Sequence, residues 1–141
     1  MKTVIIPKKI LSRQREITDA FFKVLEEHMS EITLGNAHKM FEIKDVAEIL
    51  HIHPTHLSNT IKLTTGKSPC DIYEEKIMVI ARAMLTETSA SISDIAIRLT
   101  FDPSNFTKFF KHFEGITPKQ YREQTKSAVS QSKNLGSHQK N

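Results

Sequence analysis

Two stretches of the chain repeat the same order of apolar and polar residues. Residues 43–69 align without a gap on residues 92–118. In each stretch, apolar residues recur at the spacing of one helical face, and a short break and a proline then precede a second such stretch. The first apolar sets are Val46, Ala47 and Leu50 in one copy and Ile95, Ala96 and Leu99 in the other. The repeat predicts two units, each made of a short helix, a tight turn and a second helix.

The residues at the helix ends support the same division. Pro54 and Pro103 suit the first position of a helix, because the N–H that proline lacks would be unpaired there. Asp102 precedes Pro103 and is a good N-cap, whereas His53 holds that place in the first copy and is a weaker one. The left-handed residues expected to end the two second helices are Gly66 and Gly115.

The second helix of each unit has an apolar and a polar side. The residues expected to face inward are Leu57 and Ile61 in the first copy and Phe106 and Phe110 in the second. The alanines of the first helices allow the two helices to approach closely. The outward residues are Thr55, His56, Ser58, Asn59 and Lys62, and in the second copy Ser104, Asn105, Thr107, Lys108 and Lys111. Asparagine can pair with adenine, lysine with guanine or phosphate, and serine or threonine with several groups. We therefore predict that these ten residues bind DNA, with Lys62 and Lys111, late in their helices, on phosphates.

The rest of the chain supplies three more predicted helices and a tail. An apolar stripe predicts a helix from Arg13 to about Glu31, with Ile17, Phe21, Leu25, His28 and Ile32 on one face. A connector helix is expected over Cys70–Thr86, about 25 Å long. Reading two successive major-groove segments requires about 34 Å between the second helices of the two units, which we call the recognition helices. A connector of this length, with the bodies of the two units added, is compatible with that spacing. Ser68-Pro69 and Thr117-Pro118 begin the helices after each unit, and Thr117 with Gln120 fits a capping box. The helix after the second unit is expected to be short, over Pro118–Gln124.

Composition narrows the class of protein. The 141 residues suit one domain, with an N-terminal extension (1–12), a double helix-turn-helix domain (13–124) and a disordered polar tail (125–141). The single cysteine fits a reducing compartment, and no apolar stretch is long enough for a signal peptide or a membrane span, so a cytoplasmic location is expected. The net charge of +4 modestly favours a polyanionic partner.

The sequence does not favour single-strand binding, a metal site or catalysis. The phenylalanines at 101, 106, 109, 110 and 113 could stack on bases, but their helical spacing indicates core. His51, His53 and His56 could suggest a metal site, yet the second copy has Thr100, Asp102 and Asn105 at those places. No phosphate-binding loop or catalytic motif is present, so we expect no cofactor, no metal and no enzymatic activity.

Residues 92–122 resemble the signature of the AraC/XylS family of transcriptional regulators. The matching elements are Ile95-Ala96, Leu99, Phe101, Asp102-Pro103-Ser104, Phe106-Thr107, Phe110-Lys111, Gly115, Thr117-Pro118 and Tyr121-Arg122. The resemblance covers about Ile17 to Arg122. It implies an all-α, seven-helix domain in which a long connector helix joins two helix-turn-helix units. It also implies binding to double-stranded DNA as a monomer or weak dimer, and often activation of transcription through RNA polymerase. The family's base-reading positions fall on Thr55, Ser58, Asn59, Ser104, Thr107 and Lys108.

Two departures from the family pattern lie in the second turn. Thr100 stands where the family usually has glycine, and the turn before Pro103 is about one residue shorter. Glycine adopts a positive φ at no steric cost, which threonine does not. The family also usually carries a separate effector or dimerisation domain. Few residues precede the first predicted helix here, so we interpret the chain as a stand-alone DNA-binding module or one excised from a longer regulator.

The sequence is compatible with two other functions. A helical protein-interaction module could use the short apolar start Val4-Ile5-Ile6 to dock a partner, and it would bind DNA weakly and without preference. An architectural DNA binder would show salt-sensitive affinity with little discrimination between sequences. The polar outer faces, repeated in both units, favour a sequence-specific regulator.

Overall fold

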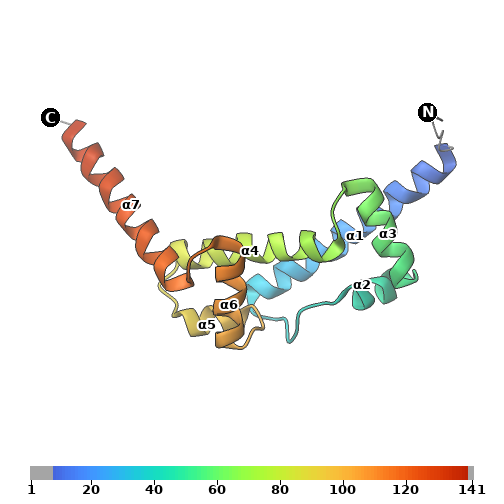
Figure 1. Ribbon diagram of the computed structural model, residues 1–141, viewed down its shortest axis with the longest axis horizontal. Coiled ribbons are helices and arrows are strands. Elements are labelled where there is room, and N and C mark those ends of the chain that lie inside the picture. The colour runs from blue at the N-terminus through green and yellow to red at the C-terminus, as the bar shows by residue number, and fades with distance from the viewer. Residues whose placement is uncertain (1–7, 140–141) are drawn as a thin grey trace. The chain divides into compact units, whose positions relative to one another are not determined.

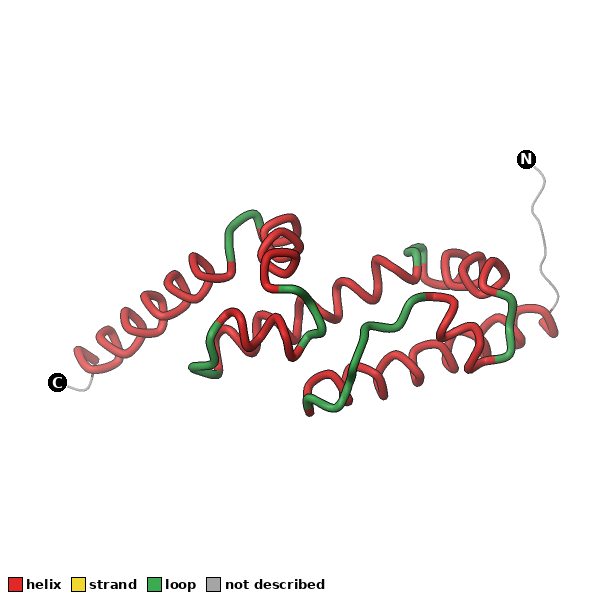
Figure 2. Tube along the Cα trace, turned by 90° about the horizontal axis from the view of Figure 1, so that it is seen from below, coloured by secondary structure: helices red, strands yellow, loops and turns green. Residues whose placement is uncertain are grey.

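Seven helices are the regular elements of residues 8–139, the part of the chain that the computed structural model describes, with side chains described to residue 128. They are α1 (Lys8–Leu34), α2 (Ile43–Leu50), α3 (Pro54–Thr65), α4 (Pro69–Glu87), α5 (Ile92–Arg98), α6 (Pro103–Glu114) and α7 (Pro118–Gln139) (Figure 1). Short loops join the helices, and these described residues contain no strand (Figure 2). The all-α, seven-helix prediction is therefore confirmed.

The contacts group the chain into two compact units. The first unit comprises residues 1–76 and the second comprises residues 77–141, so α4 begins in the first and continues into the second. Each unit contains one copy of the sequence repeat, as α2–α3 in the first and α5–α6 in the second. Among residues 8–139, no helix combines the length and the apolar character that crossing a bilayer requires.

In the first unit, α1 supplies one wall of the core and contacts both α2 and α3. Its predicted stripe is buried, including Ile17, Phe21 and Leu25, each at most 3% exposed. The hydroxyls of Thr18 and Thr64 lie 2.8 Å apart and join α1 to α3. An ion pair between Lys76 and Glu26 joins the start of α4 to α1.

In the second unit, α6 contacts both α5 and α7. The Phe110 ring meets the ring of Tyr121 edge to face, with centroids 5.4 Å apart. The guanidinium of Arg82 pairs with the carboxylate of Glu114 at 2.7 Å, which joins α4 to α6. Arg122 of α7 donates to the carbonyl of Leu85 at 3.0 Å. These contacts hold the second helix-turn-helix between α4 and α7.

Several helix bounds differ from the sequence prediction. α1 begins at Lys8 rather than Arg13 and ends at Leu34 rather than near Glu31. α7 was predicted too short, since it continues past Gln124 to Gln139 and includes most of the residues that composition assigned to a disordered tail. No proline or glycine lies between Pro118 and Gly136, so no strong helix breaker acts there. Polar composition indicates an exposed segment, and it does not by itself end a helix.

Candidate DNA-recognition surface

The turns of the two helix-turn-helix units have the same backbone geometry. In the first, the N–H of Ile52 donates to the carbonyl of Ala47 at 3.0 Å, and in the second Phe101 donates to Ala96 at 2.8 Å. Each turn passes through one left-handed residue, His51 with φ of 56° and Thr100 with φ of 66°. A left-handed residue with a bond of this kind back into the helix is the Schellman ending. The two predicted recognition helices, α3 and α6, thus follow turns of the same form.

Thr100 takes the left-handed conformation despite its branched Cβ. A β-branched residue at positive φ is a genuine outlier, and such strain costs about 1–3 kcal/mol. Its hydroxyl oxygen is also buried and has no hydrogen-bond partner. The sequence identified this turn as a departure from the family pattern, and the structure shows that the position keeps its positive φ all the same.

Both recognition helices begin as predicted. Pro103 occupies the first turn of α6, and the carboxylate of Asp102 accepts the N–H of Ser104 at 3.2 Å. In α3, the ring Nδ1 of His53 accepts the N–H of Thr55 at 3.2 Å, so the weaker cap also forms its bond. The predicted capping box is present too, since Thr117 and Gln120 exchange both of its bonds. Gly66 and Gly115 end α3 and α6 at φ of 78° and 85°.

The inward faces of α3 and α6 are fully buried. Leu57, Ile61, Phe106 and Phe110 are all 0% exposed. The alanines of the first helices, Ala47 and Ala96, are 1% and 0% exposed. Only a methyl group is buried at this position of each first helix, and α2 contacts α3 as α5 contacts α6, which is what the close helix approach predicts.

None of the ten predicted DNA-binding residues, all of which lie on α3 and α6, is buried. Eight of them are exposed, namely Thr55, His56, Asn59, Lys62, Ser104, Asn105, Lys108 and Lys111. Ser58 and Thr107, which occupy the same place in the two copies, are half-buried. Each unit therefore presents one polar helix face at the same positions of the repeat.

Two of the four hydroxyls among these ten residues already make bonds within α6 or to its N-cap. The Ser104 hydroxyl donates to the Asp102 carboxylate at 2.5 Å, and this bond holds the pKa of Asp102 below its usual value. The Thr107 hydroxyl donates to the carbonyl of Pro103 at 3.2 Å. The asparagine and lysine side chains of the same faces extend further from the helix and are better placed to reach base edges.

The comparison with protein families decides the class of this fold. The model of a helix-turn-helix domain matches residues 46–124, which is more than half of the chain and extends from within α2 into α7. The chain belongs to the AraC-type helix-turn-helix family. Its fold and family are those of sequence-specific DNA-binding transcription regulators rather than of enzymes.

Two curated relatives of this AraC-type chain are transcription regulators. An uncharacterized helix-turn-helix regulator of Bacillus subtilis, YtdP, is 32% identical over 110 residues, which are 77% of this chain and 14% of YtdP. The lactose operon transcription activator of Staphylococcus xylosus is 35% identical over 98 residues, which are 68% of this chain and 35% of the activator. The chain thus spans only a minor part of the length of either relative.

Solved structures show the same AraC-type fold. The C-terminal domain of AraT, a response regulator from Geobacillus stearothermophilus, superposes with a TM-score of 0.65 at 28% identity, over 77% of this chain and 84% of that one. The DNA-binding domain of the global transcriptional factor AdpA, solved in complex with a target DNA, superposes with a TM-score of 0.67 at 19% identity, over 82% of this chain and 96% of that one. At 19% identity this second likeness concerns the fold alone.

The three clustered histidines of the AraC-type domain have three different positions. His51 is the left-handed turn residue, His53 caps α3, and His56 lies exposed on the outer face of α3. Among residues 8–139, no group of three or more histidine, cysteine, aspartate or glutamate side chains is arranged to hold a metal ion.

The aromatic set is only partly core. Phe106 and Phe110 are fully buried, whereas Phe101 and Phe109 are half-buried and Phe113 is 40% exposed. The rings of Phe101 and Phe109 lie 5.0 Å apart and those of Phe109 and Phe113 lie 4.9 Å apart. The core assignment was therefore wrong for Phe113. Residues four apart share one helix face, but their spacing alone does not indicate whether another element covers that face.

A buried histidine of the first unit fixes the entry to α2, a role that the sequence did not reveal. His28, 5% exposed, accepts the N–H of Phe41 at 3.1 Å through its Nε2, and its ring stacks on the Phe41 ring at 3.8 Å. Phe41 directly precedes Glu42, the N-cap of α2. Burial lowers the pKa of His28, against the opposing attraction of Asp45 and Glu31. The neutral ring can accept this hydrogen bond and the protonated ring cannot.

We expect the first unit to lose stability as the pH falls below about 6.5. The unfolded chain binds a proton at His28 more readily than the folded chain does, because the pKa of His28 is lower in the folded state. The contribution of His28 to stability is therefore fully present above the unfolded pKa, and it decreases as the pH falls from the unfolded pKa to the folded pKa. Hydrogen exchange of α1–α2 amides between pH 7 and 5 would measure this. In the His28→Gln variant, whose amide oxygen can accept the bond without titrating, the dependence on pH should be smaller. An equal dependence in both proteins would contradict the role of His28.

Proposed function

We propose that this chain recognises one specific double-stranded DNA site by inserting α3 and α6 into two adjacent major-groove segments. The single observation that supports this most is the repeated geometry, in which two turns of the same backbone form are each followed by a helix with a buried apolar face and a polar outer face. A protein–protein module would have no need for two such polar faces at equivalent positions. We assign this activity to residues 13–124.

The two faces carry different side chains and are therefore proposed to read different base sequences. On α3, Asn59 can pair with adenine in a bidentate manner, and on α6 Lys108 can donate to guanine. His56 and Asn105 add a donor or acceptor at one equivalent position. Lys62 and Lys111 lie in the last turns of their helices and are assigned to phosphates, which fix the register without reading sequence.

The biological role follows from this binding. One relative is a lactose operon transcription activator, and we propose that this chain also activates transcription, with RNA polymerase as a partner. Because the two units would read unlike half-sites, binding as a monomer or weak dimer to an asymmetric site is expected. These relatives are bacterial regulators, and we propose that this chain likewise acts in the cytoplasm, where bacterial DNA lies.

The experiment that tests the proposal is a binding selection from random duplexes at about 150 mM salt. Two enriched blocks, about one helical turn apart, are expected from two working recognition helices. A single block would mean that only one unit reads DNA. Absence of any enriched sequence, with binding that only falls as salt rises, would identify an architectural binder instead.

Single substitutions should separate the two blocks. Asn59→Ala is expected to relax the block read by α3, and Lys108→Ala the block read by α6, at a cost of about 1–3 kcal/mol for each lost base contact. The same changes at exposed positions away from the recognition helices, Asn36→Ala and Lys23→Ala, should leave both blocks intact. Repeating the selection with the four variants measures this. If Asn59→Ala and Lys108→Ala weakened all sequences equally, the residues would be phosphate contacts and the assignment to bases would be wrong.

A further inference from the structure

The first unit contains a cavity away from the recognition face of α3. Its volume is about 330 Å³. The residues that matter below are Phe21 of α1, Phe41 and Glu42 of the loop before α2, Val46 of α2, and Tyr73 and Glu74 of α4. This volume lies at the lower end of the range for small-molecule sites, which are concave, mostly apolar and largely preformed.

Aromatic rings form much of the wall and are held in place by their neighbours. Phe41 is stacked on His28, with the ring planes only 4° apart. The Tyr73 hydroxyl lies 3.0 Å from Nε2 of His28 and 3.1 Å from the sulfur of Met40. Phe21 is 2% exposed and packs edge to face on Phe22. Rings fixed in this way lose little freedom when a ligand binds, which favours affinity.

The charged groups at the cavity are carboxylates. Glu42 is paired with Lys44 at 3.1 Å. Glu74 is half-buried, and within the described residues it forms no ion pair. None of the residues that line this cavity is a lysine or an arginine. An uncompensated carboxylate beside an apolar wall attracts a cation and repels an anion.

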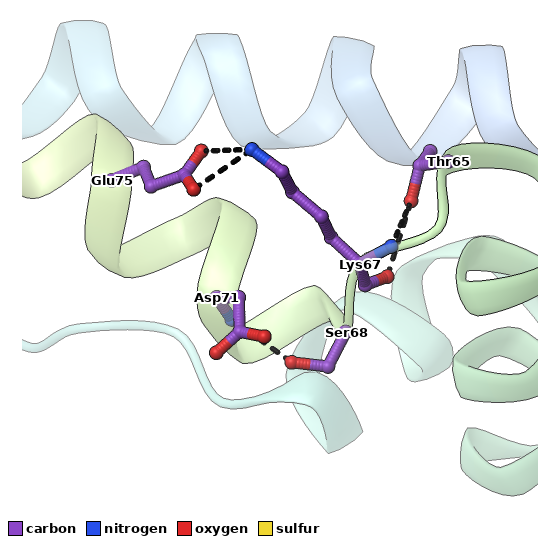
Figure 3. A network of polar contacts seen from close by, with 5 residues as sticks. All are labelled: Thr65, Lys67, Ser68, Asp71 and Glu75. Carbon is purple, nitrogen blue, oxygen red and sulfur yellow. Dashed lines mark hydrogen bonds and ion pairs between the residues drawn. The ribbon is translucent and has the colours of Figure 1, made fainter.

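The two helices that begin at the cavity do not reverse this preference. A helix N-terminus favours negative charge, but both starts are already satisfied within the protein. At α2, Glu42 and Asp45 form a reciprocal capping box. At α4, the hydroxyl of Ser68 accepts the N–H of Asp71 at 3.1 Å (Figure 3). Glu74 lies beyond this first turn, so its charge is the one left without a partner.

From these contacts we propose that the cavity binds a small organic cation, an ammonium group attached to a compact apolar or aromatic body. The rings of Phe41 and Tyr73 line the cavity and supply the electron-rich surface that attracts a cation, and the apolar body fills the space lined by Phe21 and Val46. Glu74 supplies the opposite charge. The site is independent of the DNA-recognition proposal, since it uses none of the outward residues of α3.

The test compares three ligands that differ only in their polar group. 2-Phenylethylammonium, 2-phenylethanol and 3-phenylpropanoate are titrated into the full chain by calorimetry, up to millimolar concentration, the range suited to ligands with few atoms. The cation is expected to bind at least about tenfold more tightly than the alcohol, and the anion more weakly than both. Equal binding of all three, tighter binding of the alcohol or the anion, or no binding of the cation would overturn the proposal.

A matched pair of variants locates the cation. Glu74→Gln should weaken binding of 2-phenylethylammonium about tenfold, since one charged partner is lost. Glu75→Gln makes the same change at the next residue, whose carboxylate pairs with Lys67 at 2.9 Å and does not line the cavity (Figure 3). It should leave the affinity within about twofold, as expected for an exposed pair. Equal losses in both variants would indicate attraction by net charge alone, and no loss in Glu74→Gln would also refute the site. Circular dichroism of each variant shows whether it is folded.

Discussion

Replacing Ala96 with leucine is expected to destabilise the second unit by about 3 kcal/mol and to abolish its DNA reading. Ala96 is 0% exposed, and it lies on α5, which contacts α6. An isobutyl group there can be accommodated only if the two helices separate. Hydrogen exchange of the α5 and α6 amides measures the loss, and the duplex selection shows whether the second sequence block disappears.

Two further variants make this prediction specific. Ala90→Leu adds the same atoms at an exposed position and should change stability by no more than about 0.5 kcal/mol. Ala47→Leu places the same group at the equivalent crossing of the first unit and should remove the first block instead. If Ala96→Leu retained both its protection from exchange and its sequence block, the crossing would be looser than the structure shows.

Replacing Thr100 with glycine is expected to stabilise the second unit by about 1–2 kcal/mol. The change relieves a β-branched residue held at φ of 66° and removes a buried hydroxyl that has no partner. Each of these two features costs about 1–3 kcal/mol in the parent protein. Glycine offsets part of the gain, because its greater freedom in the unfolded chain lowers stability by about 0.5–1 kcal/mol and the packing of the threonine side chain is lost. Hydrogen exchange of the α5–α6 amides or the midpoint of urea unfolding measures the balance.

The alanine variant separates the two causes. Thr100→Ala removes the unpaired hydroxyl but keeps a Cβ at positive φ, so its stability should lie between those of threonine and glycine. His51→Gly relieves the equivalent turn of the first unit, where the side chain is exposed and unbranched, and should gain less. A glycine variant less stable than the parent would show that the side chain of Thr100 contributes more packing than its strain costs.

Local signals in the sequence were sufficient for the helix-turn-helix units. Proline at the start of each recognition helix and glycine at its end act within one or two turns, so their effects can be predicted without any tertiary contact. The inward positions followed from helical periodicity, and all four are fully buried. The gapless repeat adds independent support, because the same helix-end residues and the same periodicity occur in both copies. The outward residues follow from the same periodicity, and their contacts with bases remain a prediction.

Other features depended on contacts between residues far apart in the chain. His28, Phe41 and Tyr73 meet across three elements, and the sequence identified the first of them only as part of an apolar stripe. The exposure of Phe113 depends on what lies over one face of α6, which the spacing of residues along a helix does not indicate. The cavity beside Glu74 exists because α1, α2 and α4 converge without filling the space between them. The sequence by itself therefore determined the two helix-turn-helix units and their polar faces, because those depend on neighbours within a few turns. Only the tertiary structure decided which polar groups are buried, satisfied or left unpaired, because that depends on which distant residues pack around them.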